Sequence, residues 1–485
     1  WGVIENHGLF EIGVCLPQSE KTKQFIAFAV KNLEVQVRMQ IMPDGVHWEQ
    51  SPMYHNEVLH CLLDVILLAK RNDIALPDVI LRQTEKMAMA DVAWLKPDHH
   101  IVMMGDSDDV DVRDRISVAA YLFLNPVLRF GGFDRLDYES IWDLGMKAGE
   151  EYAGMERRKP DFTSLFLEHS GNTYFRSDWS ERANFLHLHS GTMGAGHGHS
   201  DKLHIDLVVN GEDVLMDGGR YTYVSGPKRF SYKDPSGHNT ITVDDLPFTV
   251  CKDSWECSKL SQPVKENFRC MELAEFAQAG QLGYMDLPGG VYVNRKVVYI
   301  KPDLYVLADE MYTGDRHTYQ QYFHFNNHGT VTQNAPGEKK FPCVAYRGKM
   351  AETDFYFVSA QVKAELKSGH IARHYNVEEE NTVCKVTKQG EGFTSLITVI
   401  DAQPGRPLSI EKLPVRSALK QTDYPETMAE ALKITAGEKE YVVILCHQEV
   451  NSPTDLVEVD GCMGYGNVIV FDKAGDVLVG DVLNW

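Results

Sequence analysis

The chain contains 485 residues, 43% of them hydrophobic and 24% charged, an ordinary globular composition whose length predicts two or three domains. The formal net charge of −21 argues against a nucleic-acid partner, because phosphate binding requires a surplus of Lys and Arg. No apolar run is long enough to cross a bilayer, which excludes a membrane span.

Residues 1–157 carry apolar side chains three or four positions apart, the spacing of amphipathic helices. Residues 19–37 show one apolar stripe, and in residues 51–70 Ser51 can cap a helix that starts with Pro52. Further helices are expected at 80–95, 113–123 and 138–154. Successive helix pairs of this kind predict an α/α bundle or an incomplete (α/α) toroid.

From residue 158 the hydrophobic period changes to two, as in half-buried strands. The clearest examples are residues 202–217, 289–312, 440–450 and 467–482. Hairpin turns are predicted at Asn210-Gly211 and at 473–475. No helical stripes alternate with these strands, so βαβ units are not expected and antiparallel sheets are.

The predicted fold class is therefore α+β and multidomain, with an antiparallel β-sandwich after the helices. The stretch QPGRPLSIEKLP at 403–414 is a candidate boundary. We expect a helical domain at 1–157, a central sandwich at 158–405 and a smaller β-sheet at 406–485.

Nine scattered cysteines without a CxxC pair predict mostly buried free thiols, which favours a reducing compartment. The chain opens WGVIENHGLF, with neither a basic leader nor an apolar stretch, so no secretion signal is predicted. An abrupt start of this kind also suits a processed or truncated chain, which leaves the compartment open.

Residues 196–201 read GHGHSD and begin a candidate metal site. His199, Asp217 and His238 form a two-histidine, one-carboxylate set that suits Zn²⁺ or a similar divalent ion. The competing interpretation is that His197 and His199 are surface loop residues. A regular hairpin at Asn210-Gly211 would put His199 on the opposite side of the sheet from Asp217. A bulge, or a strand that starts after Ser200, would remove this conflict.

Two longer stretches resemble the signature region of the heparinase II/III-like polysaccharide lyases. They are GHGHSDKLHIDLVVNGEDVLMDGGRYTY and KRFSYKDPSGHNTITVDD. The segments ENHGLFEIG (5–13) and DGVHWEQSPMYH (44–55) resemble the two catalytic segments of that family's toroid. The resemblance implies β-elimination at a uronic acid within an acidic, glycosaminoglycan-like polysaccharide. A base removes the proton at C5, and the oxygen at C4 leaves.

The resemblance also implies roles for single residues. Asn6 would neutralise the uronate carboxylate, and Tyr54 would act as base and as acid for the leaving oxygen. His7 and His197 resemble the family's catalytic histidines, and His7 could serve as base for the epimeric uronic acid. A tyrosine with a pKa of about 10 needs neighbouring cations or donors that lower it. His199, Asp217 and His238 would hold a structural zinc beside the cleft.

This family normally has substantial helical sequence ahead of its Asn-His segment, which predicts missing first helices or a shorter toroid here. The family trend would place the protein in the periplasm or outside the cell. Two other functions remain open: a metal-dependent hydrolase that activates water, and an inactive polysaccharide-binding protein.

Several other features have simpler interpretations. The acidic stretch 105–114 lacks the Gly and Glu of an EF-hand, so we expect it to cap the helix that starts near Arg113. Lys228, Arg229 and Arg220 could bind carboxylate or sulfate groups or be ordinary surface charges. His324 is expected to be structural.

Overall fold

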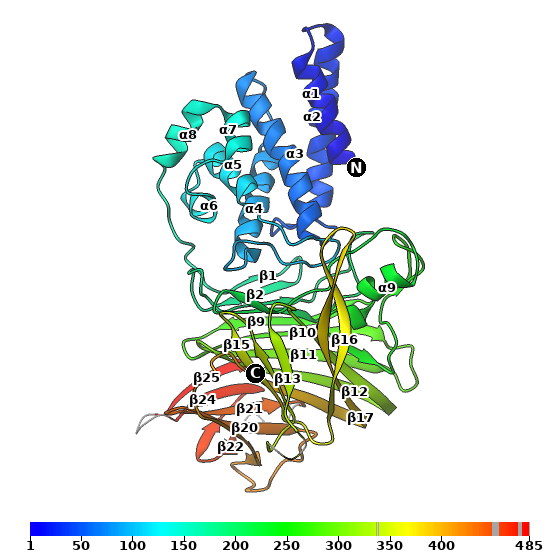
Figure 1. Ribbon diagram of the computed structural model, residues 1–485, viewed down its shortest axis with the longest axis vertical. Helices are drawn as coiled ribbons and strands as arrows, with labels where there is room; N and C mark the ends of the chain where they lie inside the picture. The colour runs from blue at the N-terminus through cyan, green and yellow to red at the C-terminus, as the bar shows by residue number, and fades with distance from the viewer. Residues whose placement is uncertain (336, 338, 449–454, 474–477, 485) are drawn as a thin grey trace.

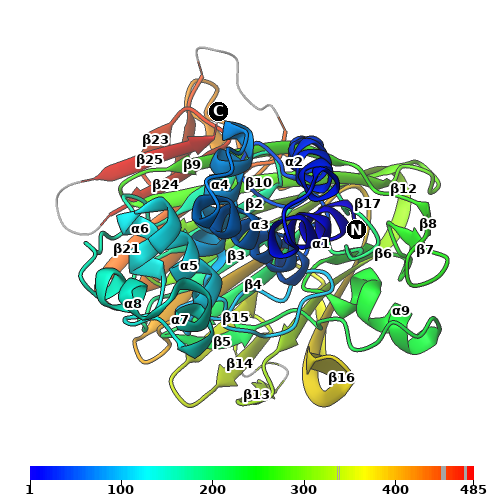
Figure 2. The same cartoon turned by 90° about the horizontal axis from the view of Figure 1, so that it is seen from above.

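Helices occupy the first third of the chain in the computed structural model, which describes residues 1–335, 337, 339–448, 455–473 and 478–484. They are α1 (Gly2–Cys15), α2 (Glu20–Gln40), α3 (Pro52–Arg71), α4 (Asp78–Trp94), α5 (Arg113–Phe123), α6 (Pro126–Gly131), α7 (Tyr138–Leu144) and α8 (Met146–Ala153). They form a layer that stands on the sheets (Figure 1), seen from above in Figure 2. Among the described residues, no helix is both long and apolar enough to span a membrane.

Local sequence explains most of these helices. Ser19 begins α2 with a capping box, in which Ser19 and Thr22 exchange side-chain and backbone hydrogen bonds. Ser51 precedes α3 as predicted, but its Oγ lies 2.9 Å from Ser107 Oγ and does not cap the helix. The predicted helix at 138–154 is two helices, because Gly145 adopts a φ of 92° between α7 and α8.

The strands of the described residues form one large sheet and three smaller ones, and the paired strands among them run antiparallel, as predicted. The large sheet contains β1 (Leu165–Leu167), β2 (Asn172–Arg176), β3 (Phe185–His189), β4 (His204–Val209), β5 (Glu212–Leu215), β6 (Ile241–Val243), β9 (Pro263–Cys270), β10 (Ala274–Tyr284), β11 (Val291–Ile300), β12 (Leu304–Phe325), β13 (Thr330–Gln333), β14 (Cys343–Arg347), β15 (Glu352–Phe357), β16 (Lys363–His374) and β17 (Val377–Asp401).

The C-terminal part adds a second sheet in the order β18-β20-β21-β24-β25. Its strands are β18 (Leu408–Leu413), β20 (Ala429–Ala436), β21 (Lys439–Cys446), β24 (Val468–Asp472) and β25 (Val479–Asn484). A small sheet holds β19 (Arg416–Ser417), β22 (Val457–Val459) and β23 (Cys462–Gly464), and a separate hairpin pairs β7 (Val250–Cys251) with β8 (Cys257–Lys259). The turn predicted at 473–475 falls mainly on 474–477, which lie outside the described residues.

The hairpin between β4 and β5 turns at Asn210-Gly211, as predicted, and pairs Val209 with Glu212. A bulge follows, so Leu207 lies opposite Leu215 and the regular register ends there. Because β4 begins only at His204, His199 belongs to the preceding loop and strand alternation does not constrain it. The bulge and the late start of β4 are the two conditions under which His199 and Asp217 can lie on the same side, and both are present.

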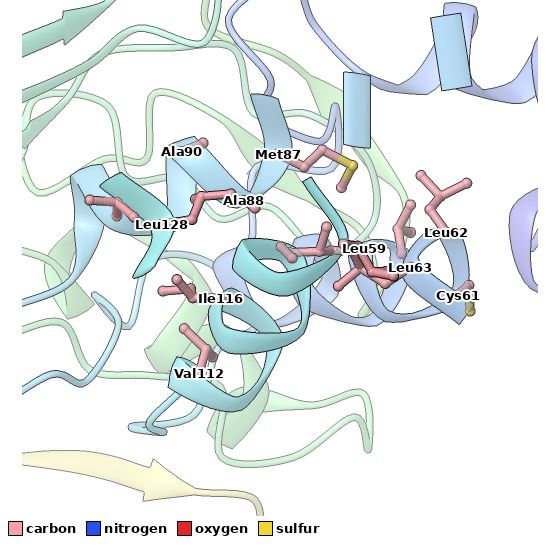
Figure 3. Packing of buried hydrophobic residues seen from close by; sticks show 14 of the residues in the cluster. Leu59, Cys61, Leu62, Leu63, Met87, Ala88, Ala90, Val112, Ile116 and Leu128 are labelled. Atoms are coloured by element: carbon pink, nitrogen blue, oxygen red, sulfur yellow. The ribbon is translucent and has the colours of Figure 1, made fainter. Parts of the chain in front are cut away.

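Buried hydrophobic clusters join these layers. In the helical layer, Leu59, Leu62 and Leu63 of α3 share one cluster with Met87 of α4 and Ile116 of α5 (Figure 3). The same cluster includes Leu167, Tyr174, Phe185 and Val208 from the first strands, so the helices pack directly on the large sheet. Burial of this apolar surface is the main favourable contribution to their association.

A different cluster joins the large sheet to the C-terminal sheet. Phe276, Val306 and Val399 of the large sheet lie in it with Leu432 and Val443 of the second sheet. The last helix of the helical layer, α8, ends at Ala153, the first strand begins at Leu165, and the second sheet begins at Leu408. The predicted limits at 157/158 and 405/406 fall in the segments between these elements, and as domain boundaries they stay predictions.

Arg295 of β11 connects the interior of the large sheet to the segments that carry Leu203 and Asn239. Its Nε and Nη2 donate to the Asp309 carboxylate of β12 at 2.6 and 2.8 Å, and both residues are fully buried. Its Nη1 donates to the carbonyl oxygens of Leu203 and Asn239. These carbonyls directly precede or follow two histidines, His204 and His238, so the guanidinium holds both segments in place.

We expect Arg295→Met to lower the free energy of unfolding by about 3–5 kcal/mol, because it leaves the Asp309 carboxylate buried and unpaired. Urea unfolding measures the loss. Arg316→Met on the exposed part of β12 is the matched control, with an expected change within about 0.5 kcal/mol. Adding Asp309→Leu to Arg295→Met should recover most of the loss. A double variant no more stable than Arg295→Met would contradict the unpaired-charge explanation.

Candidate active site

Two aromatic rings from different halves of the chain meet at the base of the helical layer. Tyr54 lies in the first turn of α3, and His197 lies in the loop between β3 and β4. Their rings stack with centroids 3.5 Å apart and an angle of 14° between the planes. Both line a cavity of about 500 Å³, whose wall also includes Gln40, Glu49 and Trp255. The structure therefore brings together two of the four predicted catalytic residues.

A buried carboxylate in the loop between α4 and α5 orients His197. Asp106 Oδ2 lies 3.0 Å from His197 Nδ1, and Asp106 Oδ1 lies 2.8 Å from His199 Nε2. Arg229, on α9 (Pro227–Lys233), donates to the same carboxylate at 2.8 Å. Burial alone would raise the pKa of Asp106, but these donors outweigh it and hold the pKa far below the usual range. Asp106 is therefore a permanent anion.

This anion fixes the tautomers of both histidines. A carboxylate can only accept hydrogen bonds, so the proton of neutral His197 sits on Nδ1 and that of neutral His199 on Nε2. His197 then keeps an Nε2 lone pair that can accept a proton, the arrangement of a histidine general base oriented by an aspartate. His199 keeps a lone pair on Nδ1, which is available to a metal ion.

The loop that carries Asp106 approaches His197 closely. Gly105 has a φ of 60°. The backbone N–H of the next residue, Asp106, donates to the His197 carbonyl at 2.9 Å. A Cβ on Gly105 would lie 2.8 Å from that carbonyl oxygen and 2.9 Å from the Gln50 carbonyl oxygen. Only glycine meets both the dihedral and the steric requirement.

A chain of donors leads to the Tyr54 hydroxyl. Asp108 pairs with Arg220, whose Nη1 donates to Tyr223 Oη at 2.9 Å, and Tyr223 Oη lies 2.7 Å from Tyr54 Oη. Because the guanidinium can only donate, Tyr223 can accept from Arg220 and donate its own proton to a Tyr54 phenolate.

The expected lowering of the Tyr54 pKa is not found in the free protein. Burial raises the pKa of Tyr54 above its ordinary value, and the hydrogen bond with Tyr223 and the charge of Arg220 offset this in part. In the free protein Tyr54 is consequently protonated at neutral pH. This state suits an acid, and a base role requires further stabilisation of the phenolate.

Asn6 and His7 point away from this cavity, because the face of α1 that carries them packs against other helices. Asn6 Nδ2 donates to the Gly2 carbonyl at 2.7 Å, and its Oδ1 accepts from Asn32 of α2 at 3.2 Å. His7 Nε2 lies 2.7 Å from Asp64 Oδ2, ten residues beyond Tyr54 on α3. Ten residues span about 15 Å of helix. The catalytic roles of Asn6 and His7 stay predictions.

Three buried ligand-type side chains meet below the cavity. Ligand atoms of His199, Asp217 and His238 all lie within 4.8 Å of one another, and the three residues are at most 1% exposed. His238 Nδ1 lies 2.7 Å from Asp217 Oδ2. Within the described part of the chain, His199 Nδ1 and His238 Nε2 have no hydrogen-bond partner. Two buried nitrogen lone pairs and a carboxylate are the donor set that Zn²⁺ prefers, so the residues fit the predicted ion.

The sequence interpretation missed Asp106, Asp108 and Tyr223. Asp106 and Asp108 lie in the acidic stretch 105–114; the N-cap of α5 is Val112 without a side-chain cap, although Asp111 accepts the Arg113 N–H at 3.0 Å. The sequence signal that could have pointed to Asp106 and Asp108 is the high density of carboxylates next to Gly105.

The basic residues proposed as anion binders are engaged in ion pairs. Arg229 and Arg220 are buried against Asp106 and Asp108, and exposed Lys228 pairs with Glu378. His324 is structural, as expected: it is buried, and its Nε2 lies 2.9 Å from the Ser236 carbonyl.

Comparison with known proteins decides the family. The model of the heparinase II/III-like C-terminal region matches residues 159–407, and that of the heparinase II/III N-terminus matches residues 1–126. The chain belongs to the heparinase II/III-like family. The resemblance seen in the GHGHSD region is thereby confirmed.

Among curated members of this family, a heparin-sulfate lyase of Pedobacter heparinus is 26% identical over 271 residues, which cover 52% of this chain and 38% of that protein. A heparin-sulfate lyase of Bacteroides thetaiotaomicron is 22% identical over 64% of this chain and 43% of that protein. The matched regions thus cover less than half the length of these relatives.

The crystal structure of a heparan sulfate lyase from Pedobacter heparinus superposes with a TM-score of 0.73 and 18% identity, covering 93% of this chain and 66% of that one. At this identity the likeness concerns the fold. It confirms an incomplete (α/α) toroid followed by antiparallel β-sheets.

The His7–Asp64 pair predicts a pH-dependent stability. Burial alone would lower the pKa of His7, but the hydrogen bonds with Asp64 and Cys61 and the charge of Glu11 together outweigh it and raise the pKa from 6.5 to about 10. The protonated ring stabilises the folded state fully below pH 6.5, and this contribution is lost as the pH rises through about 10.

We therefore expect His7→Ala to reduce the melting temperature most near pH 6 and least near pH 10, as measured by a thermal melt at each pH. Exposed His169→Ala is the control and should show no such trend. A stability loss in His7→Ala that is equal at both pH values would contradict the ion pair.

Proposed function

We propose that this chain is the catalytic part of a polysaccharide lyase that cleaves a uronic-acid-containing glycosaminoglycan by β-elimination. The observation that carries the proposal is the stacked Tyr54–His197 pair in a cavity between the helices and the sheet. Membership of the heparinase II/III-like family and the names of its curated relatives support the substrate class.

The chemistry requires removal of the C5 proton and delivery of a proton to O4. Tyr54 and His197 are both suited to proton transfer, since one carries a phenol supported by Tyr223 and the other an Nε2 lone pair oriented by Asp106. We propose Tyr54 as the residue that serves both steps. Because Tyr54 is protonated in the free protein, its base step requires stabilisation of the phenolate, to which the Tyr223 hydrogen bond and the charge of Arg220 contribute.

Neutralisation of the uronate carboxylate is assigned to Asn6 on the basis of the family resemblance. A donor amide lowers the energy of the carbanion-like transition state by binding the negative charge that develops. Because the Asn6 amide donates to the Gly2 carbonyl and accepts from Asn32 here, this role requires the side chain to leave these partners when substrate binds.

We further propose that His199, Asp217 and His238 hold a structural divalent ion, with zinc preferred. Such an ion would cross-link the loop before β4, the segment after β5 and the segment before β6. Their burial argues against a hydrolase, because water activated by this ion could not reach a polysaccharide in the cavity. His199 shares Asp106 with His197, so the ion would also stiffen the base of the active site.

A substrate panel tests the lyase. The protein is incubated with heparan sulfate, hyaluronan, chondroitin and alginate while ultraviolet absorbance and reducing ends are followed together. New absorbance from unsaturated uronate supports β-elimination. Reducing ends without absorbance would point to hydrolysis, and binding without either product would point to an inactive carbohydrate-binding protein.

Tyr54→Phe should reduce kcat by roughly 10²- to 10⁴-fold, because it removes the proton-transfer group and leaves the ring stack in place. Initial rates of absorbance gain measure the loss. Tyr152→Phe is the matched control: its hydroxyl bonds Ser117 and Phe133 inside the helical layer, away from the cavity. A Tyr54→Phe enzyme with near-normal kcat would refute the assignment.

Tyr223→Phe tests the donor chain behind Tyr54. Since the hydrogen bond with Tyr223 lowers the pKa of Tyr54, its loss should move the rising limb of the kcat profile to higher pH. An unchanged pH profile with reduced kcat would indicate a packing role only.

His238→Ala should lower bound zinc and the melting temperature together, because it deletes one of three ligands. Metal content is measured by elemental analysis, and stability by a thermal melt with and without a chelator. His324→Ala, a buried histidine outside the set, is the control and should keep its zinc content. A chelator that leaves the melting temperature of the parent protein unchanged would contradict the structural ion.

A further inference from the structure

Two cysteines face each other across the hairpin formed by β7 and β8. Cys251 and Cys257 are cross-strand partners, and their sulfur atoms lie 3.2 Å apart. The neighbouring pair makes the backbone bond, from the Lys252 N–H to the Glu256 carbonyl at 2.8 Å. Cys251 and Cys257 thus occupy the non-hydrogen-bonded position, where Cα atoms are about 4.5 Å apart, within the range of disulfides.

The tip of this hairpin forms part of the active-site wall. Trp255 lies between the two cysteines in sequence and lines the cavity. Its ring contacts that of His197 at 5.2 Å, edge to face, and that of Tyr223 at 4.9 Å. Lys233 joins the hairpin to the His197 loop by donating to the carbonyl oxygens of Ser254 and Gly196 at 2.9 and 2.6 Å.

The surroundings of the pair favour thiol chemistry. Both cysteines are partly exposed, and the sulfur of Met193 lies 3.5 Å from that of Cys257. The hydrogen bond with Cys251 holds the pKa of Cys257 below its ordinary value, burial opposes this, and Lys233 adds to the lowering. Cys257 is therefore the more nucleophilic sulfur.

We propose that Cys251 and Cys257 form a redox site whose disulfide locks Trp255 against the cavity. The oxidant is the disulfide of a small thiol such as glutathione. The Cys257 thiolate attacks it, forms a mixed disulfide and releases one glutathione thiol. The Cys251 thiolate then attacks Cys257 and releases the second, so the protein loses two protons and two electrons and one S–S bond forms.

The bond would close a loop over residues 252–256 and restrict the conformations open to its tip. In the reduced form the tip is held by non-covalent contacts: Lys233, the Ser254 hydroxyl that donates to the Tyr223 carbonyl, the Trp255 N–H that donates to Asp253, and the ring contacts. Oxidation consequently makes the wall of the cavity more rigid without adding a residue to it. This inference rests on the thiol geometry and does not require the proposed lyase activity.

The test uses the intact chain exposed to oxidised glutathione, followed by thiol alkylation, intact mass and peptide mapping. We expect an internal disulfide between Cys251 and Cys257 with no glutathione on either. Exposed Cys15, a single thiol without a cysteine partner, should carry glutathione and serve as the internal control. Cys251→Ser should convert Cys257 to a glutathione adduct. Alkylatable or glutathione-bearing Cys251 and Cys257 in the parent chain would overturn the proposal.

Limited trypsin digestion measures the effect on the hairpin tip. Cleavage after Lys252 should be slower by about tenfold or more in the oxidised protein, because the closed loop opens less often. Cleavage at exposed Lys21 is the control and should not change. Equal cleavage of the two forms after Lys252 would show that the disulfide does not lock the tip.

Discussion

The buried Asp106 carboxylate is the interaction on which the site depends. It sits in a loop between two helices, yet its partners His197, His199 and Arg229 all belong to the segments around the large sheet. Burying a charge is unfavourable unless it is fully paired, and here each oxygen has a cationic or N–H donor. The same pairing fixes both imidazole tautomers. It also holds the helical layer at a fixed distance from the large sheet.

That distance makes a composite site possible. The phenol of Tyr54 comes from the helices, whereas His197, Tyr223 and Trp255 come from loops at the edge of the sheet, so neither part contains the site alone. The proposed ion set lies directly beneath, on the same loops. Arg295 links these segments to the interior of the sandwich, because its guanidinium donates to the Asn239 carbonyl. The candidate site is thus supported by two buried ion pairs, Asp106 with Arg229 beside the cavity and Asp309 with Arg295 inside the sandwich.

The sequence predicted the elements that local patterns control. The apolar stripes of α2 to α5, the Asn210-Gly211 turn and the change of period near residue 158 follow from short-range chemistry. Helix α1 was not predicted, because its apolar side chains surround the helix and form no single stripe. Tyr54 and His197 were found through family motifs. Asp106 was not, because its role depends on contacts more than ninety positions away. The directions in which the Asn6 and His7 side chains point depend on how α1 is rotated about its own axis, and no local sequence pattern specifies this rotation.

The ring stack between Tyr54 and His197 has one more consequence. Since each ring is anchored to a different half of the chain, any rotation of the helices over the sheet would separate the rings and strain the Asp106 hydrogen bonds that cross the same boundary. In the proposed lyase, the relative placement of the two proton-transfer groups is therefore set by the contacts that hold the helical layer on the sheet.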